Sequence, residues 1–472
     1  MKIQPSDILE RADSLRWRLP QNVDDRIAES LYGTAADVAS RNVAKSGGSF
    51  RGTWQRQLDR ILTGRFTGLL AMLAIFAIVL WLTIEGANVP SAMLADLLIG
   101  KIQPWLHGLA AAAGLYPWLS GLLIDGIYLA TAWVISVMLP PMAIFFPMFT
   151  ILEDFGYLPR VAFNLDRAFQ KVGAHGKQAL TMSMGLGCNA AGVIACRIID
   201  SPRERLIAIL TNNFSLCNGR WPTQILIATV FIGTLVPGAF SGILSAACVM
   251  GVACLGFVLT FASSWVLSRT VLRGEASTFS LELPPYRPPS ILRTLYTSLI
   301  DRTLFVLWRA VVFAAPAGAL IWLVANVHVA DQSIAYWTIT GLNPIAWVMG
   351  LTGVILLAYI IAIPANEIII PTILMLTVQY AGLGGMGDGA GVMFDADGNA
   401  LRTILEAGGW SVLTAVCLML FSLAHNPCST TIYTIYKETG SWKWAALATL
   451  MPLAVGVVLC SSVAFIWRTL AG

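Results

Sequence analysis

An uncharged apolar run from Phe66 to Ile84 constrains the fold of this chain more than any other feature. Its length is close to the roughly 20 residues that a helix needs to cross a bilayer, and further apolar runs follow it. The composition agrees, because 57% of the residues are hydrophobic and only 12% are charged, against about 45–50% and about 25% in soluble domains. The sequence therefore predicts an all-α polytopic membrane protein and argues against a soluble enzyme.

The chain also contains 41 glycines and 22 prolines, which interrupt these apolar runs. Non-helical backbone inside a membrane is tolerated only where it is buried in protein or lines a cavity, so we expect broken helices around a polar path. The net charge of +4 is too small to indicate nucleic-acid binding. The eight cysteines fall in apolar segments and lack the dense spacing of a secreted disulfide scaffold, so free thiols are expected.

The positions of the basic residues predict the orientation, because cytoplasmic loops carry an excess of Lys and Arg. No signal peptide opens the chain, so the N-terminus is expected in the cytoplasm. The predicted parts are a cytosolic helical appendage (residues 1–65), a first span with an external interfacial segment at 86–118 (66–126), a first repeat (127–268), a cytoplasmic Pro-rich loop (269–303), and a second repeat with the last span (304–467).

About seven to eight membrane-spanning helices are expected, together with two short apolar hairpins whose ends return to the same face. One hairpin covers residues 180–196 and the other 345–380, and the charges flanking them place their ends on opposite faces. A helix broken around a cysteine follows each hairpin. This arrangement predicts two inverted repeats with a substrate site near the midplane of the membrane.

Four helix breaks are expected to meet at that site, and they carry polar side chains where water is scarce. The residues expected to bind a metal are Cys188, Cys217, Cys428 and Glu367. Thiolate, imidazole and carboxylate together suit a borderline-soft transition metal, although no Cys-x-x-Cys or His-x3-His spacing supports it. The further path candidates are Asn189, Asn366, His425, Asn426, Asn218 and Arg220.

Each candidate also has a structural alternative. A membrane cysteine is often a small packing residue, and the carboxylate of Glu367 could serve an unmatched helix terminus. His425 could cap the break at which it lies. Arg220 could hold a broken helix together or pair with Glu367, and it is not expected to bind metal.

A nucleotide-binding loop is not expected. The sequence Gly173-Ala-His-Gly-Lys177 superficially resembles a phosphate loop, but Lys171 stands where the first glycine belongs and Gln178 replaces the Ser or Thr that would hold magnesium. No Gly-x-Ser-x-Gly or His-Glu-x-x-His motif occurs either. The chain is therefore predicted not to be an enzyme.

Several motifs follow one another along the chain: Glu153-Asp-Phe-Gly-Tyr-Leu-Pro-Arg-Val-Ala-Phe163, Gly173-Ala-His-Gly-Lys177, Gly185-Leu-Gly-Cys-Asn189, Cys217 to Arg220 with Pro222, Glu282-Leu-Pro-Pro-Tyr-Arg287, Pro427-Cys428 and Lys437-Glu-Thr-Gly-Ser-Trp-Lys-Trp444. In this order they resemble the membrane part of ferrous iron transport protein B over about residues 55 to 465. The resemblance implies paired Gate (nucleoside-recognition) modules. It also implies that Cys188, Cys217 and Cys428 match cysteines proposed to line the iron path, and that Glu367 matches the family's acidic position.

The chain departs from the family pattern in places that matter. The family typically begins with a GTP-binding domain, whereas only 65 residues resembling the end of its helical linker precede the first span here. Ala190-Ala-Gly192 stands where the family usually has Val-Pro-Ala, and Asn366 replaces a basic residue. These departures touch the proposed path itself.

The resemblance implies a multi-pass permease of the bacterial inner membrane that carries Fe2+ inward as substrate, with no permanently bound cofactor. The expected partners are the lipid bilayer, a separate small GTPase and a small cytosolic accessory protein, and homo-oligomerisation stays open. The alternatives are a transporter of another metal or of a nucleoside-like solute, and a non-transporting Gate-module protein. Thiols at three of the four breaks favour a metal.

Overall fold

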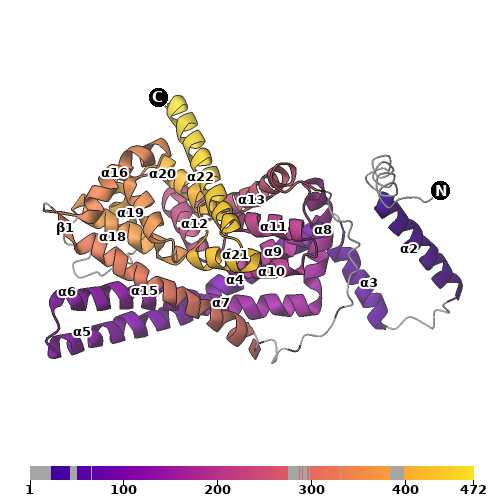
Figure 1. Cartoon of the computed structure of the whole chain (residues 1–472), viewed down its shortest axis with the longest axis horizontal. Helices are drawn as coiled ribbons and strands as arrows, with labels where there is room; N and C mark the ends of the chain where they lie inside the picture. Colours follow the sequence, from indigo (N-terminus) through magenta and orange to yellow (C-terminus); the bar gives the residue numbers. More distant parts are fainter. Residues whose placement is uncertain are drawn as a thin grey trace, which may run out of the picture.

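The computed structural model describes residues 23–42, 50–64, 66–274, 286, 290, 295–296, 298–329, 331–382 and 398–471. Within these ranges the only strands are β1 (His328–Val329) and β2 (Gln332–Ser333), which pair antiparallel. All other regular structure described is helical (Figure 1). The predicted all-α class is therefore confirmed.

The chain begins with α2 (Val23–Asn42) and α3 (Phe50–Leu62), which lie at one end of the molecule (Figure 1). A buried guanidinium connects α3 to the rest: Arg160 Nε lies 3.1 Å from Asp59 Oδ1. The Tyr286 hydroxyl donates to the same carboxylate oxygen at 2.8 Å, and the Arg160 guanidinium stacks 4.0 Å from the Tyr286 ring centre. Burial raises the pKa of Tyr286 to about 12. Of the predicted Pro-rich loop, residues 275–285, 287–289, 291–294 and 297 lie outside the described residues.

Two long antiparallel helices follow. The first comprises α4 (Thr67–Ala95), η1 (Asp96–Ile102) and α5 (Gln103–Ala112), and the second comprises α6 (Pro117–Ser120), η2 (Gly121–Tyr128) and α7 (Leu129–Phe155). The first continues well beyond the predicted span, so most of segment 86–118, expected as an external interfacial piece, is helical and continuous with it. Pro90 lies inside the helix without ending it, as is tolerated in membrane helices whose neighbours satisfy the freed backbone groups. Helix α7 contains Pro140, Pro141 and Pro147.

The first repeat contains the predicted hairpin and the predicted broken helix. Its elements are α8 (Tyr157–Lys171), α9 (Gln178–Gly187), α10 (Asn189–Ala195), η3 (Cys196–Ile198), α11 (Pro202–Thr211), η4 (Asn212–Phe214), α12 (Trp221–Ile227), η5 (Ala228–Ile232), η6 (Gly233–Leu235) and α13 (Gly238–Arg269). The hairpin is α9 with α10, and it turns at Cys188. The broken helix is α11 with α12, and it is interrupted between Thr211 and Trp221.

The second repeat has the same plan. Its elements are η7 (Ser298–Leu304), α15 (Phe305–Asn326), α16 (Ile334–Val348), α17 (Gly353–Ile361), η8 (Asn366–Ile368), α18 (Ile369–Ala381), α19 (Gly398–Ala407), α20 (Val412–Leu423), α21 (Ser429–Thr439) and α22 (Trp442–Ala471). The hairpin α17–α18 turns at residues 362–368, and α20 is broken from α21. Helix α16 was not expected as a separate element. Between α18 and α19, residues 383–397 lie outside the described residues.

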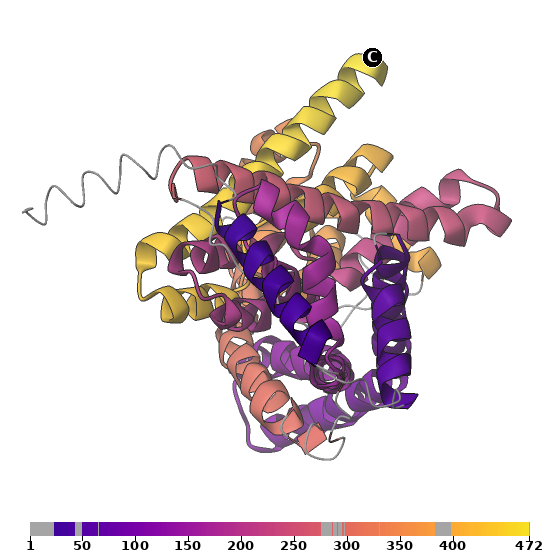
Figure 2. The ribbon, with the colours of Figure 1, turned by 90° about the vertical axis from the view of Figure 1, so that its right-hand side faces the viewer.

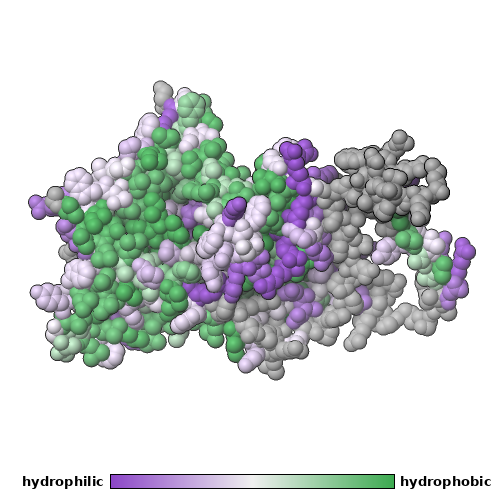
Figure 3. All heavy atoms as spheres, in the orientation of Figure 1, coloured by the Kyte–Doolittle hydropathy of each residue, from purple (hydrophilic) through white to green (hydrophobic). Residues whose placement is uncertain are grey.

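Five described helices are long and apolar enough to cross a membrane, and up to seven if each of two bent pairs is one span. The pairs are α16 with α17, bent by 109°, and α19 with α20, bent by 102°. On the face seen in Figure 3, apolar residues cover much of the left-hand side, whereas hydrophilic residues gather nearer the middle, where Figure 1 shows α8, α10 and α21. Helix α22 projects from the body with the C-terminus at its free end (Figure 2). These features agree with a polytopic membrane protein.

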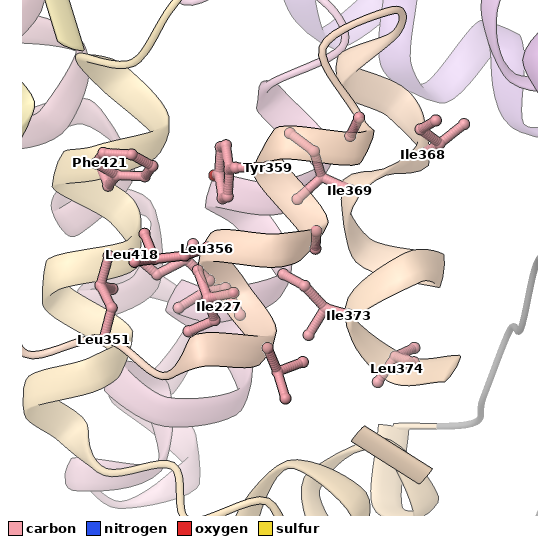
Figure 4. Packing of buried hydrophobic residues seen from close by; sticks show 14 of the residues in the cluster. Ile227, Leu351, Leu356, Tyr359, Ile368, Ile369, Ile373, Leu374, Leu418 and Phe421 are labelled. Atoms are coloured by element: carbon pink, nitrogen blue, oxygen red, sulfur yellow. The ribbon is translucent and has the colours of Figure 1, made fainter. Parts of the chain in front are cut away.

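The two repeats pack through one core. Figure 4 shows hairpin α17–α18 beside α20, with Tyr359 directed at Phe421, whose ring centres lie 5.0 Å apart. Leu356 and Leu418 continue this contact, and Ile227 of α12 brings the first repeat into the same cluster. Burial of these side chains fixes the second hairpin against both broken helices.

Candidate functional site

The four helix breaks lie next to one another, and backbone hydrogen bonds join them in pairs. The Asn218 N–H donates to the Gly187 carbonyl at 3.1 Å, which joins the first hairpin turn to the first broken helix. The Ser429 N–H donates to the Ile363 carbonyl at 2.9 Å, which does the same in the second repeat. Peptide groups that would otherwise lack partners inside the membrane are thereby satisfied.

The two hairpin turns have nearly the same backbone conformation. Cys188 precedes α10 with φ −153° and ψ 121°, and Ala365 precedes η8 with φ −151° and ψ 120°. An asparagine follows in both cases, Asn189 in the first turn and Asn366 in the second. The turns are structural equivalents that carry a thiol in one repeat and a methyl group in the other.

All four predicted metal-binding residues line one cavity between these breaks: Cys188, Cys217, Cys428 and Glu367. Its volume is about 40 Å³, well below the roughly 300–1,000 Å³ of pockets that enclose organic ligands. Of the other path candidates, Asn189, Asn218 and Asn366 also line the cavity. The predicted convergence of the breaks is therefore present in the structure.

His425 lies one layer behind the cavity wall. The side-chain amide of Asn366 lies between the Cys217 sulfur, 3.8 Å from Nδ2, and the His425 ring, whose Nε2 is 3.3 Å from Oδ1. The His425 Nδ1 lies 2.9 Å from the Ser422 carbonyl, three residues earlier in the chain. The imidazole thus caps the end of α20 and reaches the cavity only through Asn366.

Arg220 holds the breaks together from behind the cavity and is fully buried. Its Nη1 donates to the carbonyls of Asn213 at 2.9 Å and Leu423 at 3.1 Å, and its Nη2 lies 3.4 Å from the Asn426 carbonyl. Of the two alternatives for Arg220, the geometry supports bracing of the broken helices. Asn426 takes part through this carbonyl, and its side chain is not in the cavity wall.

Sequence reasoning missed three contributors to the site. Asn213 donates from Nδ2 to the His425 carbonyl at 2.6 Å and accepts from Arg220 at Oδ1, so it connects the two repeats. The Thr431 hydroxyl lies 3.2 Å from the Cys428 sulfur, a contact that the i, i+3 spacing on α21 predicts. Met138, one turn before Met142 on α7, adds a thioether to the wall.

Two glycines allow close approach around the site. A side chain at Gly219 would meet the Glu367 carboxylate, and one at Gly187 would meet the Phe145 ring of α7. These residues keep the carboxylate and the thiols at the cavity surface. Among the described residues no group of three His, Cys, Asp or Glu is close enough to hold one metal ion. The thiols of Cys188, Cys217 and Cys428 thus line the cavity as separate groups.

Comparison with known families identifies the class of this fold. The Gate model, described as Nucleoside recognition, matches residues 135–231 and 307–442, which hold the two repeats. The chain is thus a Gate-type helical membrane protein. A second model, Ferrous iron transport protein B C terminus, matches residues 249–301 between them. Together the two models match more than half of the chain, which is therefore similar to ferrous iron transport protein B over its apolar part.

Several relatives align over most of the chain. It is 27% identical to Fe(2+) transporter FeoB of Staphylococcus aureus (strain MSSA476) over 466 residues, which are 96% of this chain and 66% of the relative. It is also 27% identical over 453 residues to Fe(2+) transporter FeoB of Methanocaldococcus jannaschii, covering 93% of this chain and 62% of that one. The chain thus spans just under two thirds of the length of the curated relatives that it matches. No solved structure matches it.

Proposed function

We propose that this chain carries Fe2+ across the membrane into the cytoplasm through the cavity between the four helix breaks. The observation that carries the proposal is the lining of that cavity by three thiols and one carboxylate, from Cys188, Cys217, Cys428 and Glu367. Sulfur and oxygen ligands together suit a borderline transition metal. The match to the model Ferrous iron transport protein B C terminus, and relatives named Fe(2+) transporter, support iron as that metal.

The cavity also favours a metal over the alternatives. Its volume of about 40 Å³ is small for a nucleoside. No Phe, Tyr or Trp is among the described residues that line this cavity. The rings of Tyr359 and Phe421 in the second repeat pack on His425 instead. A non-transporting protein would have no need of three thiols and a carboxylate around one cavity.

Anaerobic Fe2+ uptake into proteoliposomes tests this function. We expect Cys188→Ser and Cys428→Ser each to lower the uptake rate about tenfold or more, because a hydroxyl is nearly isosteric with a thiol but a much poorer ligand for Fe2+. Cys460→Ser is the matched control. Cys460 is buried, its Sγ donates to the Cys417 carbonyl at 3.2 Å, and it does not line the cavity. Wild-type rates in both cavity variants would refute the proposal, and nucleoside uptake measured in the same vesicles would identify the organic-solute alternative.

The remaining features of the system are proposed on the same basis. The membrane is the bacterial inner membrane with the N-terminus in the cytoplasm, where the hydrophilic residues around α8 would lie (Figure 3). A separate GTPase docks on residues 1–60 and loop 269–302, and the chain itself hydrolyses no nucleotide. A relative from Porphyromonas gingivalis, 26% identical over 370 residues, is named a fusion of Fe(2+) transport protein A with the transporter, which supports a small accessory partner. Deletion of residues 2–48 tests the docking, because it keeps Asp59 and its bond to Arg160.

A further inference from the structure

A second cavity lies at the opposite end of the molecule from α8, where β1 and β2 join α15 to α16 (Figure 1). Its volume is about 150 Å³. Seven polar residues line it: His328, Asp331, Gln332, Ser333, Tyr336, Gln379 and Tyr380. None of them belongs to the cavity between the helix breaks, so a function for this second cavity must be argued from its own chemistry.

The imidazole of His328 is oriented as a metal ligand requires. Its Nδ1 lies 3.0 Å from the Asn326 carbonyl, which can only accept a hydrogen bond. The neutral ring therefore carries its proton on Nδ1 and keeps a lone pair on Nε2. Metal-binding histidines commonly have this arrangement, in which a backbone carbonyl fixes the tautomer.

The other polar groups of the cavity also offer acceptors. The Gln379 side chain donates from Nε2 to the Ala325 carbonyl at 2.7 Å, so its Oε1 is the end of the amide that remains to accept. Asp331 adds a carboxylate from an exposed turn. No Lys or Arg occurs between Arg309 and Arg402, the stretch from which every lining residue comes. The lining thus includes one carboxylate, one imidazole and one side-chain amide, from Asp331, His328 and Gln379, and no Lys or Arg.

This chemistry selects a divalent cation of borderline hardness, for which nitrogen and oxygen ligands are suitable. We propose that the His328–Asp331–Gln379 cavity binds a divalent metal ion on the extracytoplasmic side of the protein. If this cavity is the entry site for the transported ion, that role rests on the proposed transport function. Helix α18 connects the two sites. It begins directly after η8, which carries Glu367, and its last turn carries Gln379 and Tyr380. Its 13 residues span roughly 20 Å at 1.5 Å per residue.

Direct binding of Mn2+ to the full chain in lipid nanodiscs, followed by electron paramagnetic resonance, tests the site without any transport. We expect His328→Ala and Asp331→Asn each to weaken one class of Mn2+ sites at least tenfold. Asp331 has φ 63°, and asparagine also tolerates this left-handed conformation, so Asp331→Asn should leave the turn intact. Asp96→Asn is the charge-matched control, because Asp96 pairs with Lys101 and does not line the cavity.

Unchanged Mn2+ binding in both cavity variants, or an equal loss in Asp96→Asn, would overturn the inference. Fe2+ uptake then separates the two proposals. An entry site predicts that His328→Ala raises the half-saturating outer Fe2+ concentration several-fold and leaves the maximal rate unchanged. If the cavity variants lose Mn2+ binding but the wild type transports no metal, the site is supported and the transport function is refuted. If the wild type transports Fe2+ but the cavity variants bind Mn2+ unchanged, the transport function is supported and the site is refuted.

Discussion

The two hairpin turns of the repeats share a backbone but differ in chemistry. The turns before α10 and η8 have torsion angles within a few degrees of each other, and each is hydrogen-bonded to the broken helix of its own repeat. The first presents the thiol of Cys188 to the cavity, whereas the second presents the methyl group of Ala365 and, two residues later, the carboxylate of Glu367. The backbone of a Gate repeat therefore sets where a ligand lies, and the side chain alone decides which ligand it is.

The brace behind the cavity is also asymmetric. Arg220 of the first repeat donates to carbonyls of both repeats, and within the described residues the second repeat has no buried arginine of its own. A single guanidinium thus serves two broken helices. The symmetry of the backbone depends on a residue that is present once.

The largest expected effect comes from removing this brace. Arg220→Met leaves the carbonyls of Asn213 and Leu423 without their buried donor, which should destabilise the protein by about 1–3 kcal/mol for each carbonyl. The measurement is the unfolding midpoint of purified protein in detergent. Arg197→Gln, which removes an exposed arginine paired with Glu438, should shift that midpoint far less. Equal midpoints for wild type and Arg220→Met would show that the repeats need no common brace.

The next prediction tests whether the two turns are interchangeable. Cys188→Ala should lower Fe2+ uptake about tenfold or more, because one soft ligand is lost from the cavity. Adding Ala365→Cys to that variant restores a thiol at the equivalent position of the other turn, and part of the uptake should return. The comparison fails if the double variant transports no better than Cys188→Ala while its Mn2+ binding and folding remain normal.

The smallest expected effect concerns the base of the first hairpin, which carries titratable groups. The Lys177 N–H donates to His175 Nδ1 at 3.0 Å, so this nitrogen must stay unprotonated. Burial is the main cause that lowers the pKa of His175, with Lys177 adding to it and Glu204 and Asp200 opposing it. Because the unfolded chain then binds the proton more readily, stability should fall as the pH drops below about 6.5, the ordinary value for His.

Thermal unfolding between pH 7.5 and 5.5 measures this effect. His175→Asn offers an acceptor oxygen to the Lys177 N–H but cannot titrate in this range. Its stability should therefore vary less with pH than that of the wild type. Parallel pH curves for the two proteins would assign the acid sensitivity to other groups.

The sequence predicted the breaks better than the helices between them. Gly, Pro and Asn mark the turns at Cys188, at Cys217 and at 363–367 because these residues tolerate or enforce non-helical backbone, and polar residues inside apolar runs imply a common cavity. The ends of α4 and the existence of α16 were missed. Both segments combine apolar residues with Pro and Gly, and a neighbouring helix rather than the local sequence decides whether such a segment stays helical.

The sequence also could not distinguish the residues that line the cavity from those that support it from behind. His425, Asn426 and Arg220 lie at the same breaks as the cysteines, and only packing places them behind the cavity wall while Cys428 faces it. No sequence pattern marked Asn213 as part of the site. One asparagine in a polar run does not reveal that its side chain bonds the His425 carbonyl, more than two hundred residues away. Spacing identifies where a chain turns, whereas the distance of a side chain from the cavity depends on tertiary contacts.

The three prolines of α7 give this helix a particular mechanical character. Each proline lacks the N–H that would bond the preceding turn, so Pro140, Pro141 and Pro147 remove three backbone bonds within about two turns. The same stretch carries Met142 in the cavity wall and Phe145 against Gly187 of the first hairpin turn. The missing bonds lower the bending stiffness of α7, and flexing it about these residues would widen or narrow the cavity while the hydrogen bonds between the breaks remain in place.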